Sequence, residues 1–138
     1  MNDLALRGKR ILIVEDNALV AKFFRMAIER AGGGECILSE DVPTILHHAA
    51  SGELDLVLLD VSLTNSEWEG RAINGVELCR MVKEKSPRRL PVLLATAHAM
   101  SGDRERFLAT SGADGYLEKP VYDSAILVEK VRSLIDLV

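Results

Sequence analysis

Five side chains able to take part in chemistry each follow a short apolar run of the sequence. They are Glu15, Asp16, Asp60, Thr96 and Lys119. Carboxylates that are brought together raise one another's pKa unless a cation holds them. Mg²⁺, a hard ion that prefers oxygen ligands and keeps several waters, suits such a site. If these residues meet, we expect Asp16 and Asp60 to bind Mg²⁺ directly and Glu15 to bind it through water.

A metal ion, an ammonium group and a hydroxyl around one carboxylate suit the handling of anionic oxygens. Phosphoryl transfer needs this arrangement, because it depends on charge neutralisation and in-line positioning. Asp60 is the expected nucleophile, giving an acyl phosphate, since it alone ends a central apolar strand. Taken singly, the residues have structural interpretations, such as Thr96 as a helix N-cap and Lys119-Pro120 as a turn. Their recurrence at successive strand ends favours a site.

The elements that must position these residues alternate along the chain. Apolar runs predict five strands, over residues 11–14, 36–38, 56–59, 91–95 and 115–117. The first, third and fourth are apolar on consecutive residues, as in strands covered on both faces. Helical spacing predicts helices over 17–31, 42–50, 74–85, 101–110 and 124–138, the last burying Leu127, Val131, Leu134 and Ile135.

This alternation predicts an α/β fold, a doubly wound five-stranded parallel sheet with helices on both faces. Ligands of such folds bind outside the carboxyl ends of the strands. Because these ends share one edge of the sheet, the polar residues that follow the strands are expected to converge there.

Composition and charge limit the classes of function. The chain has 138 residues, 48% of them hydrophobic and 28% charged, which is typical of one globular domain. Its formal charge of −4 disfavours nucleic-acid binding. No run is long enough for a signal peptide or a membrane span. Cys36 and Cys79 lack metal-ligand spacing and are expected to be reduced, so we expect a cytoplasmic protein.

Four motifs together resemble the receiver domain of two-component response regulators, in the CheY-like superfamily. They are ILIVEDN (11–17), LVLLD (56–60), VLLATAHA (92–99) and GADGYLEKP (112–120). The resemblance implies a flavodoxin-like (βα)5 receiver domain over residues 10–138, preceded by an N-terminal extension over residues 1–9. A single-domain response regulator of a phosphorelay is the expected function.

The resemblance also assigns roles at the site. It implies that Asp60 accepts a phosphoryl group from a histidine kinase or a histidine phosphotransfer protein. Mg²⁺, or Mn²⁺ in its place, would be held by Asp16, Asp60 and the backbone carbonyl of Ser62, with Glu15 at the family's other acidic position. Thr96 and Lys119 would bind phosphoryl oxygens. No enzymatic activity is implied beyond self-phosphorylation and dephosphorylation.

Further residues are assigned to switching and to the lifetime of the phosphoryl group. Tyr116 matches the family's switch aromatic, which turns inward as Thr96 moves, and Pro120 matches a position that often follows a cis peptide bond. Ser62 and His98 match positions that tune dephosphorylation. The expected output is a downstream protein that binds the last two helices and the last strand, with homodimerisation on phosphorylation as a further expectation.

The stretch between Ser62 and Asn74 departs from the family. It is thirteen residues long, against roughly 2 to 6 for an ordinary strand-to-helix loop. Residues 64–71 are predicted to form a mobile acidic loop with Trp68 as an aromatic anchor. Two interpretations stay open: a tolerated surface insertion, and a partner-recognition or lid element beside Asp60.

Two other functions compete with the phosphoacceptor. A receiver that serves as a docking module without phosphorylation is disfavoured by the complete set of site residues. The run from Asp60 to Thr64 is also similar to the nucleophile motif of haloacid-dehalogenase-like phosphatases. Those enzymes place a second aspartate where this chain has Ser62, and they are usually larger.

Overall fold

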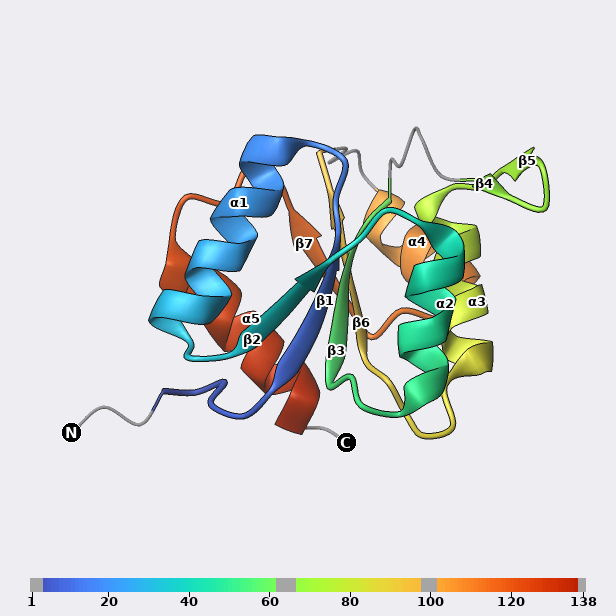
Figure 1. The fold of residues 1–138 in the computed structure, drawn as a ribbon. Helices are drawn as coiled ribbons and strands as arrows, with labels where there is room; N and C mark the ends of the chain where they lie inside the picture. The colour runs from blue at the N-terminus through green and yellow to red at the C-terminus, as the bar shows by residue number, and fades with distance from the viewer. Residues whose placement is uncertain (1–3, 62–66, 98–101, 137–138) are drawn as a thin grey trace.

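The computed structural model of the chain describes residues 4–61, 67–97 and 102–136. Five strands form one parallel sheet in the order β2-β1-β3-β6-β7 (Figure 1). The strands are β1 (Arg10–Val14), β2 (Glu35–Leu38), β3 (Leu56–Asp60), β6 (Val92–Thr96) and β7 (Gly115–Glu118). The predicted doubly wound α/β fold is therefore confirmed, and strand order reverses between β1 and β3.

Helices cover both faces of this sheet. Figure 1 shows α1 and α5 on one face and α2, α3 and α4 on the other. The helices are α1 (Ala18–Met26), which continues through a π-helical turn (Ala27–Ala31), then α2 (Val42–Ser51), α3 (Gly75–Lys85), α4 (Asp103–Ser111) and α5 (Ser124–Asp136). The buried side predicted for α5 is confirmed, since Leu127, Val131, Leu134 and Ile135 all lie in the core.

The central strands β3 and β6 are buried along their whole length. Successive side chains point to opposite faces of a strand, so Val57 and Leu59 join the core under α2 and α3, whereas Leu56 and Leu58 join the core under α1 and α5. This two-sided burial explains the unbroken apolar runs. It also leaves the strand ends as the places where polar side chains can be accommodated.

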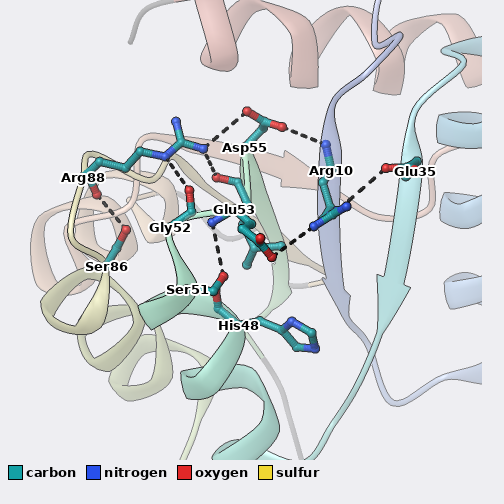
Figure 2. Close-up of polar contacts among 10 residues, drawn as sticks. Arg10, Glu35, His48, Ser51, Gly52, Glu53, Asp55, Ser86 and Arg88 are labelled. Atoms are coloured by element: carbon teal, nitrogen blue, oxygen red, sulfur yellow. Dashed lines mark hydrogen bonds and ion pairs between the residues drawn. The ribbon is translucent and has the colours of Figure 1, made fainter.

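A polar network ties together the opposite edge of the sheet, where the strands begin (Figure 2). The Asp55 carboxylate accepts the Arg10 N–H at 2.8 Å. The Arg88 guanidinium donates to the carbonyl oxygens of Gly52, at 2.9 Å, and Leu54, at 2.5 Å. Because these contacts fix the entry of β3 against β1 and the loop before β6, they help to hold the register of the central strands.

Asp114 secures the start of β6 in a similar way. Its carboxylate accepts the Val92 N–H at 2.9 Å, contacts the Lys83 ammonium, and accepts from Arg89 at 2.9 Å. Burial raises the pKa of Asp114, but these donors outweigh burial and hold the pKa below its ordinary value. The ionised carboxylate therefore stabilises the junction of α3, β6 and β7 at neutral pH.

The sequence predicted a loop for the insertion, but part of it forms a short β-hairpin. Strands β4 (Glu67–Trp68) and β5 (Arg71–Ala72) pair antiparallel through a two-residue turn. Glu69 and Gly70 both have positive φ, 52° and 78°, as the type I′ turn of tight hairpins requires. A glutamate at the first turn position is a weak signal for this turn, which explains why the sequence pattern missed it.

The two cysteines carry no disulfide, as expected, and Cys79 is buried. Burial raises the pKa of the Cys79 thiol to about 11, so this thiol is a poor nucleophile at neutral pH. Among the described residues, no helix has the length and apolar character needed to span a membrane.

The segment before β1 packs on the core. Leu6 is fully buried, and its N–H donates to the Gly32 carbonyl at 2.7 Å. A Cβ at Gly32 would lie 2.8 Å from the Leu6 side chain, and one at Gly33 would lie 2.6 Å from Leu4. The glycines after the first helix therefore make room for this segment, and the domain boundary at residue 10 stays a prediction.

The burial of Leu6 gives a stability prediction. Leu6→Ala should lower the free energy of unfolding by about 2–5 kcal/mol, because it leaves a cavity in the core. Leu19→Ala is the matched control, since Leu19 is 79% exposed and its loss should change stability by at most about 0.5 kcal/mol. Urea titration measures both values. Equal, small effects would mean that the N-terminal segment does not pack in solution.

Candidate functional site

The backbone brings the candidate residues to one edge of the sheet. Asp60 is paired with Ala95 of β6, and the Val61 N–H donates to the Ala95 carbonyl at 2.9 Å. The Lys119 N–H donates to the Thr96 carbonyl at 2.7 Å. The ladders thus continue one residue beyond the strands, which fixes Asp60, Thr96 and Lys119 beside one another.

The Lys119 ammonium joins two of the carboxylates. Its Nζ lies 2.9 Å from Glu15 Oε1 and 3.6 Å from Asp60 Oδ1. The other Glu15 oxygen, Oε2, accepts the Asn17 N–H at 3.1 Å. Glu15 and Asp60 are both buried, and only 3% of Asp60 is exposed. Lys119, which is 104 positions from Glu15 in the sequence, therefore balances negative charge at the end of β1.

Three carboxylates form a group that fits a hard cation. Glu15, Asp16 and Asp60 each offer an oxygen, and these atoms lie within 4.8 Å of one another. All three ligands are oxygens, which suits Mg²⁺ or Mn²⁺. The Glu15 oxygens accept hydrogen bonds from Asn17 and Lys119. The assignment of Asp16 and Asp60 as direct ligands, with Glu15 bound through water, stays a prediction.

Glu15 shows the electrostatic cost of burying a carboxylate in this group. Its burial raises the pKa of the carboxyl group, the Lys119 and Asn17 hydrogen bonds lower it, and the charge of Asp60 raises it again. The net direction is upward. A bound divalent cation would add the positive charge that favours the ionised form.

Thr96 and Tyr116 lie on neighbouring strands beside this group. Thr96 is fully buried, and Tyr116 is paired with Leu94 on β6. Leu94 and Tyr116 belong to the same core cluster, and Thr96, two residues after Leu94, points to that same face of the sheet. The Lys119-Pro120 bond is cis, in agreement with the family position assigned to Pro120.

Ser62 and His98 lie outside the described residues. The metal-binding carbonyl assigned to Ser62 and the effects on dephosphorylation assigned to Ser62 and His98 therefore stay predictions.

Gly75 is a constraint on the site that the sequence did not disclose. A Cβ at Gly75 would lie 2.3 Å from the Asp60 carbonyl oxygen and 2.7 Å from Val61 Cα. The Gly75 N–H also donates to the Val61 carbonyl at 3.0 Å. The insertion thus leaves and rejoins the fold at one point, directly behind Asp60. Only the unusual length of the strand-to-helix connection signalled this part of the chain.

An apolar groove next to the carboxylates was also missed. It has a volume of about 460 Å³ and lies between α1 and the segment after β7. Leu19, Phe23, Val121 and Tyr122 line it, and it reaches Asn17 and Lys119. Leu19 and Tyr122 are 79% and 86% exposed. In the sequence, the only signal for this groove was that Leu19 is an apolar residue outside the stripe of α1 that faces the core.

The fold and the polar edge define a class of small α/β proteins with an acidic cleft at the strand ends, and sequence comparison assigns the family. Residues 11–132 match the response regulator receiver domain. The chain is 36% identical over 114 residues to the polar-differentiation response regulator DivK of Brucella anthropi, a match that covers 82% of this chain and 85% of DivK. The chain therefore belongs to the response regulator receiver domain family, as its motifs indicated.

Solved structures agree with this assignment. A CheY-like receiver domain protein from Methanospirillum hungatei JF-1 has a TM-score of 0.75 and 26% identity, over 94% of both chains. The receiver domain of a sensor histidine kinase from Pseudomonas aeruginosa PAO1 has a TM-score of 0.75 and 28% identity, over 94% of this chain and 98% of that chain. The latter structure holds a magnesium ion in its active site cleft.

The close approach at Gly75 predicts the effect of one added methyl group. Gly75→Ala should displace the Asp60 backbone and lower the free energy of unfolding by about 1–3 kcal/mol, as overpacking does. The measurements are urea titration and the backbone amide shifts of Asp60 and Val61 by NMR.

Gly112→Ala is the control. Gly112 has a φ of 77°, and a Cβ at this position would meet no atom within 4 Å. This variant should cost about 1–2 kcal/mol in backbone strain alone and leave the Asp60 shifts in place. Unchanged Asp60 shifts in Gly75→Ala would contradict the close contact behind the acceptor.

Proposed function

We propose that this protein is a single-domain response regulator of a phosphorelay, in which Asp60 accepts a phosphoryl group from a phosphohistidine. The observation that carries the proposal is the setting of Asp60. Its carboxylate is 3% exposed, lies in a three-carboxylate group and has the Lys119 ammonium 3.6 Å from one oxygen. A rigid carboxylate between a cation site and an ammonium is suited to attack on an anionic phosphorus centre.

The chain's own residues would divide the work. An Asp60 oxygen would bond to phosphorus while the phosphorus–nitrogen bond to the donor imidazole breaks, and the imidazole nitrogen would keep the electron pair. Lys119 would neutralise one phosphoryl oxygen, and the Thr96 hydroxyl would donate to another. Asp16 and Asp60, with Glu15 through water, would hold Mg²⁺ or Mn²⁺, which supplies charge neutralisation when bound.

The comparisons support this proposal in two ways. DivK, with 36% identity, is a polar-differentiation response regulator, which favours a regulatory role for this chain. The Pseudomonas receiver domain coordinates magnesium in its active site cleft, and this chain has an acidic group that fits the same ion. We propose that the protein has a signalling role in the cytoplasm and no enzymatic activity beyond turnover of its own phosphoryl group.

Output would follow from a change at Thr96 and Tyr116. Both lie on the face of the sheet next to α4, and β7 is an edge strand between α4 and α5. We propose that a downstream protein binds the surface built by α4, β7 and α5. On α5, Ile126 is an exposed apolar residue, with 59% of its surface accessible. Homodimerisation on phosphorylation stays a prediction.

A small phosphodonor tests the central proposal. Incubation with Mg²⁺ and acetyl phosphate should add one phosphoryl group, detected by mass, and chelation of the metal should abolish the addition. Asp60→Asn should remove it, and Lys119→Met should slow it by about 10²-fold, because one charge-stabilising donor is lost. Glu118→Gln is the control, since this exposed carboxylate neighbours Lys119 in sequence.

Two outcomes would overturn the proposal. If wild-type protein gains no phosphoryl group, a docking module that works without phosphorylation becomes the better account. If the group persists in Asp60→Asn, the acceptor is another residue.

The apolar groove supports a protein donor that docks beside Asp60. Leu19, Tyr122 and Lys119 all line the groove. We propose that a helix carrying the phosphohistidine places an apolar side there, because exposed apolar side chains at such a site lower the cost of desolvation on binding. The acceptor cleft and the groove would then be used in one encounter.

Tyr122→Ala should therefore separate protein donors from small ones. Transfer from a phosphorylated histidine phosphotransfer protein should fall by about tenfold or more, as for an aromatic anchor of an interface, and the acetyl phosphate rate should stay unchanged. Leu38→Ala, which truncates another exposed apolar residue (42%), is the control. Equal losses with both donors would refute docking in the groove.

A further inference from the structure

The ring of Phe107 on α4 stacks on the ring of Tyr116 on β7. Their centroids lie 6.3 Å apart, and the ring planes differ by 17°. Tyr116 is 7% exposed, and Phe107 is partly buried against the same core cluster. The Arg106 guanidinium carbon lies 5.1 Å from the centroid of the Phe107 ring. Offset stacking and a cation over an aromatic ring are both favourable arrangements.

Helix α4 is joined to its neighbours at its C-terminal end and through this stack. At the C-terminal end, Arg80 Nε donates to the Thr110 carbonyl at 2.5 Å, and the Thr110 hydroxyl donates to the Arg106 carbonyl at 2.8 Å. At the N-terminal end, Gly102 provides no side-chain cap. Among the described side chains of α4, Phe107 and Leu108 are the apolar ones that pack against the core cluster. The stack thus joins α4 to β7.

The stack also lies close to the acceptor site along the sheet. Tyr116 is opposite Leu94, and Thr96 follows two residues later on the same face of β6. The next backbone contact in this direction is the Lys119 N–H to the Thr96 carbonyl, at 2.7 Å. A change in the Tyr116 ring position therefore alters the packing beside Thr96 and, through Phe107, the packing of α4.

We propose that Phe107 is a positioning residue that holds Tyr116 in its buried orientation before phosphorylation. Its consequence is that the switch is biased toward the inward state in the unphosphorylated chain, and this consequence rests on the proposed function. A phosphoryl analogue that prefers the inward state binds more weakly when that state is less populated. Loss of the stack should therefore weaken binding of a phosphoryl analogue by about two- to tenfold.

Fluorine NMR of the full chain labelled with 3-fluorotyrosine tests the position of the ring. The chain has two tyrosines, Tyr116 and Tyr122, and Tyr122→Phe assigns the signals. Without any phosphoryl analogue, the Tyr116 signal of the wild type should be protected from a soluble paramagnetic agent. In Phe107→Leu, this protection should fall at least threefold, and it should return when beryllofluoride and Mg²⁺ are added.

Two further variants separate positioning from general packing. Phe107→Tyr keeps an aromatic ring and should restore the protection, with one extra signal of its own. Met81→Ala removes a partly buried side chain of the same cluster on α3 and should leave the protection of Tyr116 unchanged. The half-saturating beryllofluoride concentration should rise about two- to tenfold in Phe107→Leu alone.

The outcomes distinguish this inference from the proposed function. An exposed Tyr116 signal in the unliganded wild type, or equal protection in the wild type and Phe107→Leu, would overturn the inference. The first of these measurements needs no Phe107 variant, only Tyr122→Phe for assignment, so it stands even if Phe107→Leu fails to fold. Failure of beryllofluoride to bind the wild type would instead count against the proposed function, and the protection of unliganded Tyr116 in the wild type and in Phe107→Leu would still test the stack.

Discussion

The site depends on the balance of three carboxylates against one ammonium at a single edge of the sheet. Lys119 reaches Glu15 at 2.9 Å and Asp60 at 3.6 Å, and burial still raises the pKa of Glu15 above its ordinary value. A bound divalent cation would favour the ionised form of these carboxylates. Two backbone hydrogen bonds extend the strand pairing of β6 by one residue, from Val61 on one side and from Lys119 on the other. They hold the charged side chains in place, so the geometry of the site depends on the pairing of the sheet.

The insertion gives this chain a feature of its own without disturbing that edge. Gly75 hydrogen-bonds to Val61 and nearly touches the Asp60 carbonyl, so the residues on either side of the insertion lie together behind the acceptor. The hairpin packs Trp68 partly against the core and ties Arg71 to Glu77 on α3 at 2.8 Å. It projects beyond α2 and α3 at the acceptor edge of the sheet (Figure 1). A position beside the site is compatible with a role in choosing partners.

Two surfaces meet at the acceptor, and they differ in character. The groove beside α1 is apolar and open, with Leu19 and Tyr122 at its rim. The surface on the other side, around α4 and β7, contains an aromatic stack and the contact of Arg80 with the C-terminal end of α4. Under the proposed function, the groove would serve input and the α4 surface would serve output.

The five strands of the parallel sheet and the five helices could be predicted from the sequence, because the spacing of apolar residues is a local signal. The family could be predicted because its motifs lie at the ends of these strands. The same pattern named Asp16, Asp60, Thr96 and Lys119 as residues that a parallel sheet must bring to one edge. Which partners these residues contact depends on the folded chain. The pairing of Lys119 with Glu15, the stack of Phe107 on Tyr116 and the packing of Leu6 against Gly32 join positions apart in the sequence, and no local pattern encodes them. The hairpin was missed for a different reason: its turn places a glutamate at positive φ, a conformation that the packing of neighbouring residues must stabilise because the residue's own preference opposes it.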